Sequence, residues 1–202
     1  SAFLGAITIG LMLIAGGLGP HAPGLAVAVW GVAVGAHLAI GVWTVRGLLV
    51  APREAATLTP PLLIPLVGNI VAPVVGCRLG FVEVSWALFG LGALLWAMIQ
   101  PSILHRIATG PSMPDRLKPT LGILLAPPAV GSVAFAELTG GFGPGPSAIY
   151  GLAAFVAAVL LTLVPMFRRI PFAISWWGWT FPAAAFAVAT IGFGRDHPGL
   201  AP

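Results

Sequence analysis

Seven stretches of mostly apolar residues, separated by short segments that carry the charges and turn residues, run the length of this chain. In order they are spans one to seven, at residues 1–18, 24–45, 61–80, 81–101, 119–138, 147–167 and 172–193. A helix that crosses the hydrocarbon core of a bilayer needs about 20 such residues. The sequence therefore predicts an all-α membrane protein with seven transmembrane helices.

Charged residues are too few to cover a water-exposed surface. Only 7% of the 202 residues are Asp, Glu, Lys or Arg, whereas the surface of a soluble domain carries about 25–35%. Most of the surface must therefore face lipid, which excludes a cytosolic enzyme and a nucleic-acid-binding protein. The single cysteine, Cys77, allows neither a disulfide framework within the chain nor a cysteine metal cluster.

The basic residues are distributed unevenly between the two sides of the predicted helices. Seven of the nine follow spans two, four and six, and two lie on the opposite side. The seven are Arg46, Arg53, Arg106, Arg116, Lys118, Arg168 and Arg169. Because loops rich in Lys and Arg stay in the cytoplasm, we expect these three loops to be cytoplasmic. The short loops are typical of a multi-pass protein of a bacterial inner membrane.

Proline divides the spans into two kinds. Spans two, four and six have none in their interiors, span one is rich in glycine, and spans three, five and seven contain Pro65, Pro73, Pro127, Pro128 and Pro182. Proline bends a helix, and bent backbone at membrane depth is tolerated where it is buried in protein or lines a cavity. We therefore expect helical-hairpin repeats of about 53–59 residues, with kinked odd spans inside and straight even spans outside. The alternative is that Pro and Gly are simply common in membrane helices.

Ionisable side chains at membrane depth mark proton relays and ion coupling, and this chain has very few. His37 lies near the middle of span two, whereas Glu83 and Glu137 lie near the ends of spans four and five. Neither a second histidine at membrane depth, nor a phosphate-binding GxxxxGK[ST] motif, nor a nucleophile beside a base is found in the sequence. We therefore expect no cofactor, no metal, no catalytic residue and no enzyme, with His37 a structural residue and both glutamates solvated.

The remaining hypothesis is a transport pathway through the membrane, lined by small residues, kinked backbone and aromatic rings. Its candidate lining or kink residues are Gly10, Gly68, Pro73, Pro128, Gly131 and Pro182. We expect exposed N–H groups at helix breaks to attract anions weakly, without a fixed cation. Since Pro182 cannot donate a hydrogen bond, the bend of span seven is expected around Phe181. Phe181 is then either a plug in a narrow passage or ordinary apolar bulk.

Four stretches resemble one family of membrane transporters. The segment WAMIQPSILHRIATGPSMPDRLKPTLGILLAPPAVGSVAF, at 96–135, resembles the join of helices six and seven in the tellurite-resistance/C4-dicarboxylate transporter family of the voltage-dependent anion channel superfamily. This family includes plant slow anion channels. SWWGWTFPAAAFAVAT (175–190) is similar to its ninth helix, PLLIPLVGNIVAPVVG (61–76) to its fifth, and SAFLGAITIGLMLIAGGL to its third. The stretches ILLAPPAV and SWWGWTFP are the most specific.

The resemblance implies a ten-helix protein made of five hairpins. Odd-numbered helices surround a pore, even-numbered helices lie outside, and three subunits form a homotrimer in which each has its own pore. A phenylalanine of the ninth helix occludes the pore in this family, and Phe181 is the matching residue. Residues 1–202 would be a single, incomplete transmembrane domain equivalent to helices three to nine, whose four pore helices cannot close a ring.

We therefore expect a passive anion channel or anion transporter, gated by Phe181, that moves small inorganic or carboxylate anions across a lipid bilayer. We expect it to use no ATP and to bind no nucleic acid. Which anion it moves stays open. One alternative is a proton-coupled carrier for dicarboxylate, sulfite or tellurite, in which His37, Glu83 or Glu137 takes the proton. The other is a structural membrane subunit that transports nothing.

Overall fold

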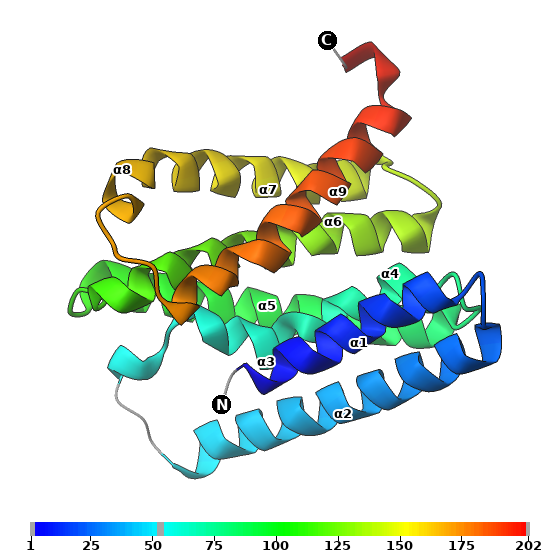
Figure 1. Cartoon of the computed structure of the whole chain (residues 1–202), viewed down its shortest axis with the longest axis horizontal. Helices are drawn as coiled ribbons and strands as arrows, with labels where there is room; N and C mark the ends of the chain where they lie inside the picture. The colour runs from blue at the N-terminus through cyan, green and yellow to red at the C-terminus, as the bar shows by residue number, and fades with distance from the viewer. Residues whose placement is uncertain (1–2, 52–54, 201–202) are drawn as a thin grey trace.

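The structure is a computed structural model that describes residues 3–51 and 55–200, and every regular element in those ranges is helical (Figure 1). The α-helices are α1 (Leu4–Leu18), α2 (Pro23–Val50), α3 (Leu63–Val67), α4 (Ala72–Gly76), α5 (Val82–Thr109), α6 (Ala126–Thr139), α7 (Pro144–Thr162), α8 (Val164–Phe167) and α9 (Thr180–Asp196). The 3-10 helices are η1 (Ala55–Thr57), η2 (Pro60–Leu62), η3 (Gly68–Val71), η4 (Asp115–Leu125), η5 (Ile174–Trp179) and η6 (Pro198–Leu200).

Four helical segments are long and apolar enough to cross a membrane: α2, α5, η4 with α6, and α7. Two shorter apolar segments, α1 and the run from η2 to α4, occupy spans one and three, and η5 with α9 occupies span seven. The predicted all-α membrane fold is confirmed. α5 extends further than predicted, to Thr109, and contains Pro101 inside the helix.

Spans three and five form an inner layer, whereas α1 and α9, which were also predicted inside, are mostly not buried, with five of 15 and three of 17 residues buried. We compare the most apolar 18 residues of each long segment. Of these, 72% are buried inside the protein in η4 with α6, against 28% in α2 and 17% in each of α5 and α7. Large apolar side chains on these three helices, such as Val32, Leu94 and Leu161, are about 70% exposed. Such surfaces suit contact with lipid, so the straight helices lie outside, as proline placement predicted.

The proline-containing spans change from one helix type to another at or near their prolines. Span three is divided into α3, η3 and α4, span five changes from 3-10 to α at Ala126, and span seven changes at Thr180. A proline removes one donor of the α-helical ladder, and 3-10 winding is common at such interruptions. α1 is different, because it is one continuous α-helix despite its glycines. The change of helix type that interrupts the other three spans is therefore absent from α1, since glycine permits a break without forcing one.

The connections lie at the two ends of the bundle. Those that follow α2, α5 and α7 are at one end, on the left in Figure 1, and those that follow α1, α4 and α6 are at the other. The main core lies where the inner elements meet one another and the buried sides of α2, α5 and α7, and it includes Met12, Leu66 and Ala129. A second, smaller core around Phe142 and Ala189 joins α9 to α6 and α7.

Candidate pore

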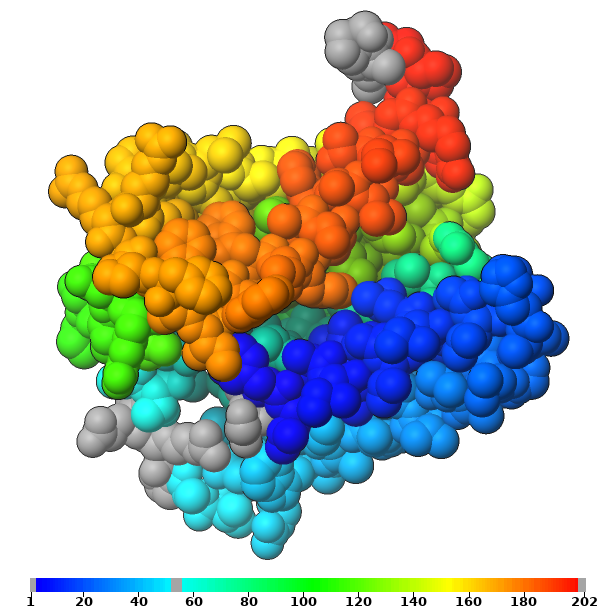
Figure 2. Space-filling view, viewed as in Figure 1, coloured from blue at the N-terminus to red at the C-terminus, as the bar shows by residue number. Residues whose placement is uncertain are grey.

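A cavity of about 370 Å³ lies among the four proline- or glycine-rich spans. Its wall is made by α1, by α3 with η3, by the junction of η4 and α6, and by the junction of η5 and α9. Figure 2 shows the surface hollowed between the blue atoms of α1 and the orange atoms at the start of α9. We call this space the central cavity.

The wall of the central cavity is almost entirely apolar. Its described lining residues include no charged side chain, and Thr180 supplies the one hydroxyl group among them. That hydroxyl donates a hydrogen bond to the carbonyl oxygen of Trp177, at 2.8 Å. The wall can therefore offer an ion only weak, neutral contacts.

Backbone N–H groups at the helix junctions do not point unpaired into the cavity. The N–H groups of Ala72, Ala126 and Thr180 each donate to the carbonyl three residues earlier. The expectation of exposed donors at these three breaks is therefore wrong, because the change to 3-10 winding supplies an acceptor for each.

Phe181 lies in the wall of the central cavity, half-buried and packed against the main core. It follows the junction of η5 and α9 by one residue, and the buried Pro182 comes next. The change from 3-10 to α winding is thus at Thr180, next to the residue around which the sequence predicted a bend.

Close packing of η5 on η4 positions this ring. A Cβ atom on Gly122 would lie 2.7 Å from the Trp179 ring, so only glycine lets the two segments approach this closely. Trp179 also meets Phe167 edge to face, with ring centroids 5.3 Å apart. Sequence reasoning missed the contact between Gly122 and Trp179, because it joins segments almost 60 residues apart.

Four of the predicted pore residues line the central cavity, namely Gly10, Gly68, Phe181 and Pro182. Gly10 faces open space, because a Cβ atom added there would have no other atom within 4 Å. Gly68 is different, since a Cβ there would lie 2.5 Å from Cε1 and Nε2 of His37. Gly10 thus leaves room in the cavity, and Gly68 lets His37 of α2 pack closely against η3.

Three further candidates, Pro73, Pro128 and Gly131, are buried outside the lining of the central cavity. Pro127 lines it next to Pro128. A Cβ on Gly131 would lie 3.1 Å from Cδ1 of Ile70, so this glycine serves the contact between α6 and η3.

His37 is fully buried and supports the cavity wall from behind. Its Nδ1 lies 2.6 Å from Oγ1 of Thr8 in α1, and its Nε2 has no hydrogen-bond partner among the described residues. His37 was expected on an outward-facing helix, but its ring faces the inner layer, against Gly68.

The two glutamates proposed for proton coupling also lie off the cavity lining. Glu83 is exposed in the first turn of α5. Glu137 accepts two hydrogen bonds from Arg78, one of them from Nε at 3.2 Å. The same carboxylate raises the pKa of Arg78. The pair joins the connection after α4 to the last turn of α6.

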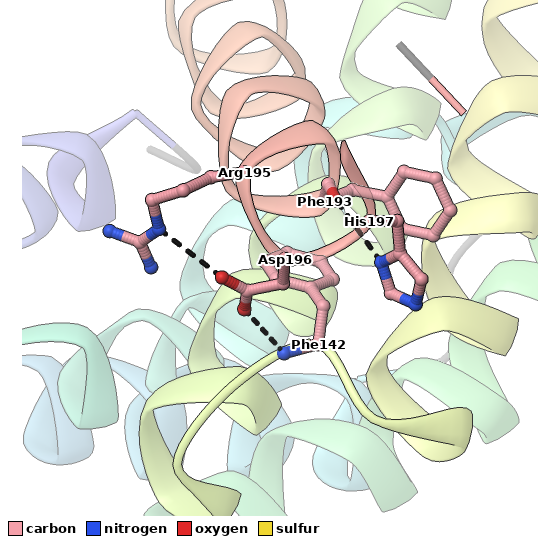
Figure 3. A network of polar contacts seen from close by, with 5 residues as sticks. All are labelled: Phe142, Phe193, Arg195, Asp196 and His197. Carbon is pink, nitrogen blue, oxygen red and sulfur yellow. Dashed lines mark hydrogen bonds and ion pairs between the residues drawn. The ribbon is translucent and has the colours of Figure 1, made fainter. Parts of the chain in front are cut away.

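The far end of α9 is fastened to the connection between α6 and α7 (Figure 3). Oδ2 of Asp196 accepts the N–H of Phe142 at 2.9 Å, and Oδ1 accepts Nε–H of Arg195 at 3.2 Å. These contacts, the first above all, lower the pKa of Asp196. α9 is therefore anchored at the end opposite to Phe181.

Two layers of apolar helices, with broken inner segments around an uncharged cavity, define a multi-pass membrane protein with the architecture of a channel or transporter. A sequence model of the family described as voltage-dependent anion channel matches residues 1–201. The chain belongs to this family, which confirms the resemblance seen in the sequence.

Several proteins of Arabidopsis thaliana are similar to this chain. The S-type anion channel SLAH3 is 31% identical over 139 residues, which cover 69% of this chain and 22% of that protein. The S-type anion channel SLAH2 is 28% identical over 149 residues, covering 74% and 29%. The guard cell S-type anion channel SLAC1 is 26% identical over 147 residues, covering 73% and 26%. The chain thus spans less than a third of these relatives, which are named as channels and not as enzymes.

Proposed function

We propose that this chain carries the permeation pathway of an anion channel or anion transporter, with the central cavity as part of the pore and Phe181 as its gate. The observation that carries the proposal is the composition of the cavity wall, which combines all four inner segments, no charged side chain, and Phe181. The names of the relatives as S-type anion channels support anions as the transported class.

An uncharged wall suits fast permeation. An ion that binds weakly leaves quickly, whereas a fixed cation in the wall would retain an anion. The barrier would then come from the apolar ring of Phe181 and from the cost of moving an anion past apolar surface. We infer that a change of the Phe181 side-chain rotamer would widen the passage while Pro182 and the anchored end of α9 stay in place.

We further propose, from the family resemblance, a homotrimer in which each subunit has its own pore within a ring of five inner helices. The chain would supply the equivalents of helices three to nine. We also propose a bacterial inner membrane, with the loops after α2, α5 and α7 in the cytoplasm. The excess of Lys and Arg in and next to these loops, at one end of the bundle, supports this orientation. Arg46 and Arg106, expected in loops, lie within α2 and α5, and Arg53 lies outside the described residues.

The test measures chloride and nitrate currents across planar bilayers that contain the protein or its Phe181→Ala variant. Phe186→Ala is the matched control, because Phe186 is a half-buried aromatic residue of the same helix that stacks on Tyr150 away from the cavity lining. We expect a small current from the parent and from Phe186→Ala, and a much larger current from Phe181→Ala.

Two results would contradict the gate. An equal rise with Phe186→Ala would show that loosened packing, and not an opened passage, causes the current. No current from any variant, despite correct insertion, would favour a proton-coupled carrier or a structural subunit. Uptake of sulfite and malate at different pH values, with His37, Glu83 and Glu137 replaced together, then separates these two.

A further inference from the structure

The segment that joins α8 to η5 exposes two basic and two large apolar side chains. Arg168 and Arg169, which directly follow α8, are exposed, and Phe172 and Ile174 are exposed to 77% and 82%. Exposed apolar side chains are unfavourable in water, and a charged arginine is unfavourable in hydrocarbon. Both kinds within seven residues suit a boundary between water and lipid. We call residues 168–174 the interfacial segment.

The length of α7 places the interfacial segment at a membrane surface. α7 has 19 residues, which is about 28 Å at 1.5 Å per residue, and the hydrocarbon core of a bilayer is about 30 Å thick. Only 17% of the apolar window of α7 is buried inside the protein, so this helix faces lipid. Beyond it, the short α8 leads into the segment, and the chain then turns back towards η5 and α9 (Figure 1). The segment therefore lies where the chain leaves and re-enters the bilayer.

Hydrogen bonds and ring contacts hold the backbone of the interfacial segment. The N–H groups of Arg168 and Arg169 donate to carbonyl oxygens of α8. The indole N–H of Trp176 donates to the carbonyl oxygen of Pro171, at 3.2 Å. The Trp176 ring also meets the buried ring of Phe167 edge to face, with centroids 6.2 Å apart. The backbone is thus held on both sides of the segment, while its large apolar side chains remain outside the core.

The end of the bundle that carries this segment is positively charged. Seven of the nine basic residues of the chain lie in or next to the connections after α2, α5 and α7, together with two of the five acidic ones. The excess remains however these groups pair. Anionic phospholipids carry the complementary charge, and the planar guanidinium group is well suited to phosphate. An acidic protein would match the charge as well, but a lipid also supplies acyl chains to the exposed Phe172 and Ile174.

We propose that the interfacial segment binds anionic phospholipids. Arg168 and Arg169 contact the phosphate groups, and Phe172 and Ile174 insert among the upper parts of the acyl chains. Charge attraction and buried apolar area both contribute to binding of this kind. The surface is distinct from the central cavity, and the proposal does not depend on anion permeation.

The first test measures thermal unfolding of the purified protein in an uncharged detergent, with phosphatidylglycerol or phosphatidylcholine added at equal concentrations. The variant Arg168→Gln/Arg169→Gln removes both charges of the segment. Arg46→Gln/Arg116→Gln is the matched control, because it removes two exposed arginines at the same end of the bundle but outside the segment.

We expect phosphatidylglycerol to raise the melting temperature of the parent more than phosphatidylcholine does. Each arginine near an anionic surface strengthens binding severalfold. Arg168→Gln/Arg169→Gln should therefore need at least about tenfold more phosphatidylglycerol for half of the same rise. The control variant should respond nearly as the parent does, because attraction from charges outside the contact is screened.

The second test measures the depth of position 172 in vesicles that contain phosphatidylglycerol. Phe172→Cys, in a Cys77→Ser background, carries a nitroxide spin label, and Ser112→Cys, in the polar connection after α5, is the water-exposed reference. We expect the label at 172 to collide more with oxygen than with a water-soluble nickel complex. The label at 112 should show the opposite preference.

The proposal is overturned if phosphatidylglycerol stabilises the parent no more than phosphatidylcholine does, or if both double variants lose the response equally. It is also overturned if the label at 172 is reached by the nickel complex, or if it is shielded from both reagents, which would place Phe172 against another protein surface. Should Arg168→Gln/Arg169→Gln not fold, the comparison of the two lipids on the parent and the label at 172 still decide.

Discussion

Gly68→Ala tests the close contact between the wall of the central cavity and His37. A Cβ atom at position 68 would lie 2.5 Å from two atoms of the imidazole and 2.9 Å from Cδ1 of Ile9. Ordinary contacts begin at about 3.4 Å, so the ring or the backbone must move by almost 1 Å. The ring has little freedom to move, because it is fully buried and held by Thr8.

The expected cost follows from two opposing effects. Overpacking of this kind costs about 1–3 kcal/mol, and replacing a helical glycine with alanine recovers about 0.5–1 kcal/mol. The net loss should be about 1–2 kcal/mol, which corresponds to a melting temperature about 2–8 °C lower for a chain of this size.

Thermal and denaturant unfolding in detergent measure this loss, with Gly10→Ala as the matched control. Gly10 also lines the central cavity, but its methyl group would meet no atom within 4 Å, so this variant should be neutral or slightly stabilised. In a His37→Ala background the new methyl group gains room, so Gly68→Ala should then cost little. The double-mutant cycle should show a coupling of about 1–2 kcal/mol.

The reasoning is refuted if Gly68→Ala is as stable as Gly10→Ala. It is equally refuted if the effects of Gly68→Ala and His37→Ala simply add, because additivity would show that the methyl group and the ring do not compete for space.

Three further predictions concern contacts around the pore. Gly122→Ala should displace the Trp179 ring and lower stability by about 1–3 kcal/mol. It should also raise the basal current in planar bilayers, although Phe181 itself is intact. An unchanged current would show that the contact between Gly122 and Trp179 does not position Phe181. Glu137→Gln should cost at most about 1 kcal/mol, because its ion pair is partly exposed, and should leave transport unaffected in an uptake assay. Asp196 has a lowered pKa, so its contribution is present above the unfolded value of about 3.9 and lost as pH falls through the lower folded value. The parent should therefore lose stability below about pH 4, and Asp196→Asn should lack that step in unfolding curves recorded against pH.

Proline made the layer arrangement predictable, because the missing N–H is a local property that no packing can restore. The helix type changes one residue before Pro127 and two before Pro182, and both segments line the cavity. Glycine did not allow the same inference for α1, which stays continuous. Pro101 coincides with the predicted end of span four, but α5 continues past it, because a single lost hydrogen bond in an otherwise regular helix need not end it.

The contacts that shape the site could not be predicted, because a sequence pattern indicates a helix without indicating its neighbour. Gly122 against Trp179 and Gly68 against His37 are pairings between distant segments. His37 was expected to face outward because its span is an outer one. Even an outer helix packs one side on the inner layer, and the nearly uniform apolar sequence of α2 does not reveal which side that is.

The positions of the ionisable groups bear on whether transport is passive or coupled to protons. A coupled carrier needs a titratable group that meets the substrate path, but Glu83 is exposed on the outer layer, Glu137 is paired with Arg78, and His37 lies behind the cavity wall. A passive pore of the kind proposed needs none of these groups, because its barrier would be set by the apolar wall and the ring of Phe181. We therefore expect the reversal potential of the Phe181→Ala current to follow the chloride gradient and to stay constant when a pH gradient is imposed. A shift of the reversal potential with the pH gradient at fixed chloride would show proton coupling. His37, whose ring lies against the lining residue Gly68, would then be a candidate proton carrier.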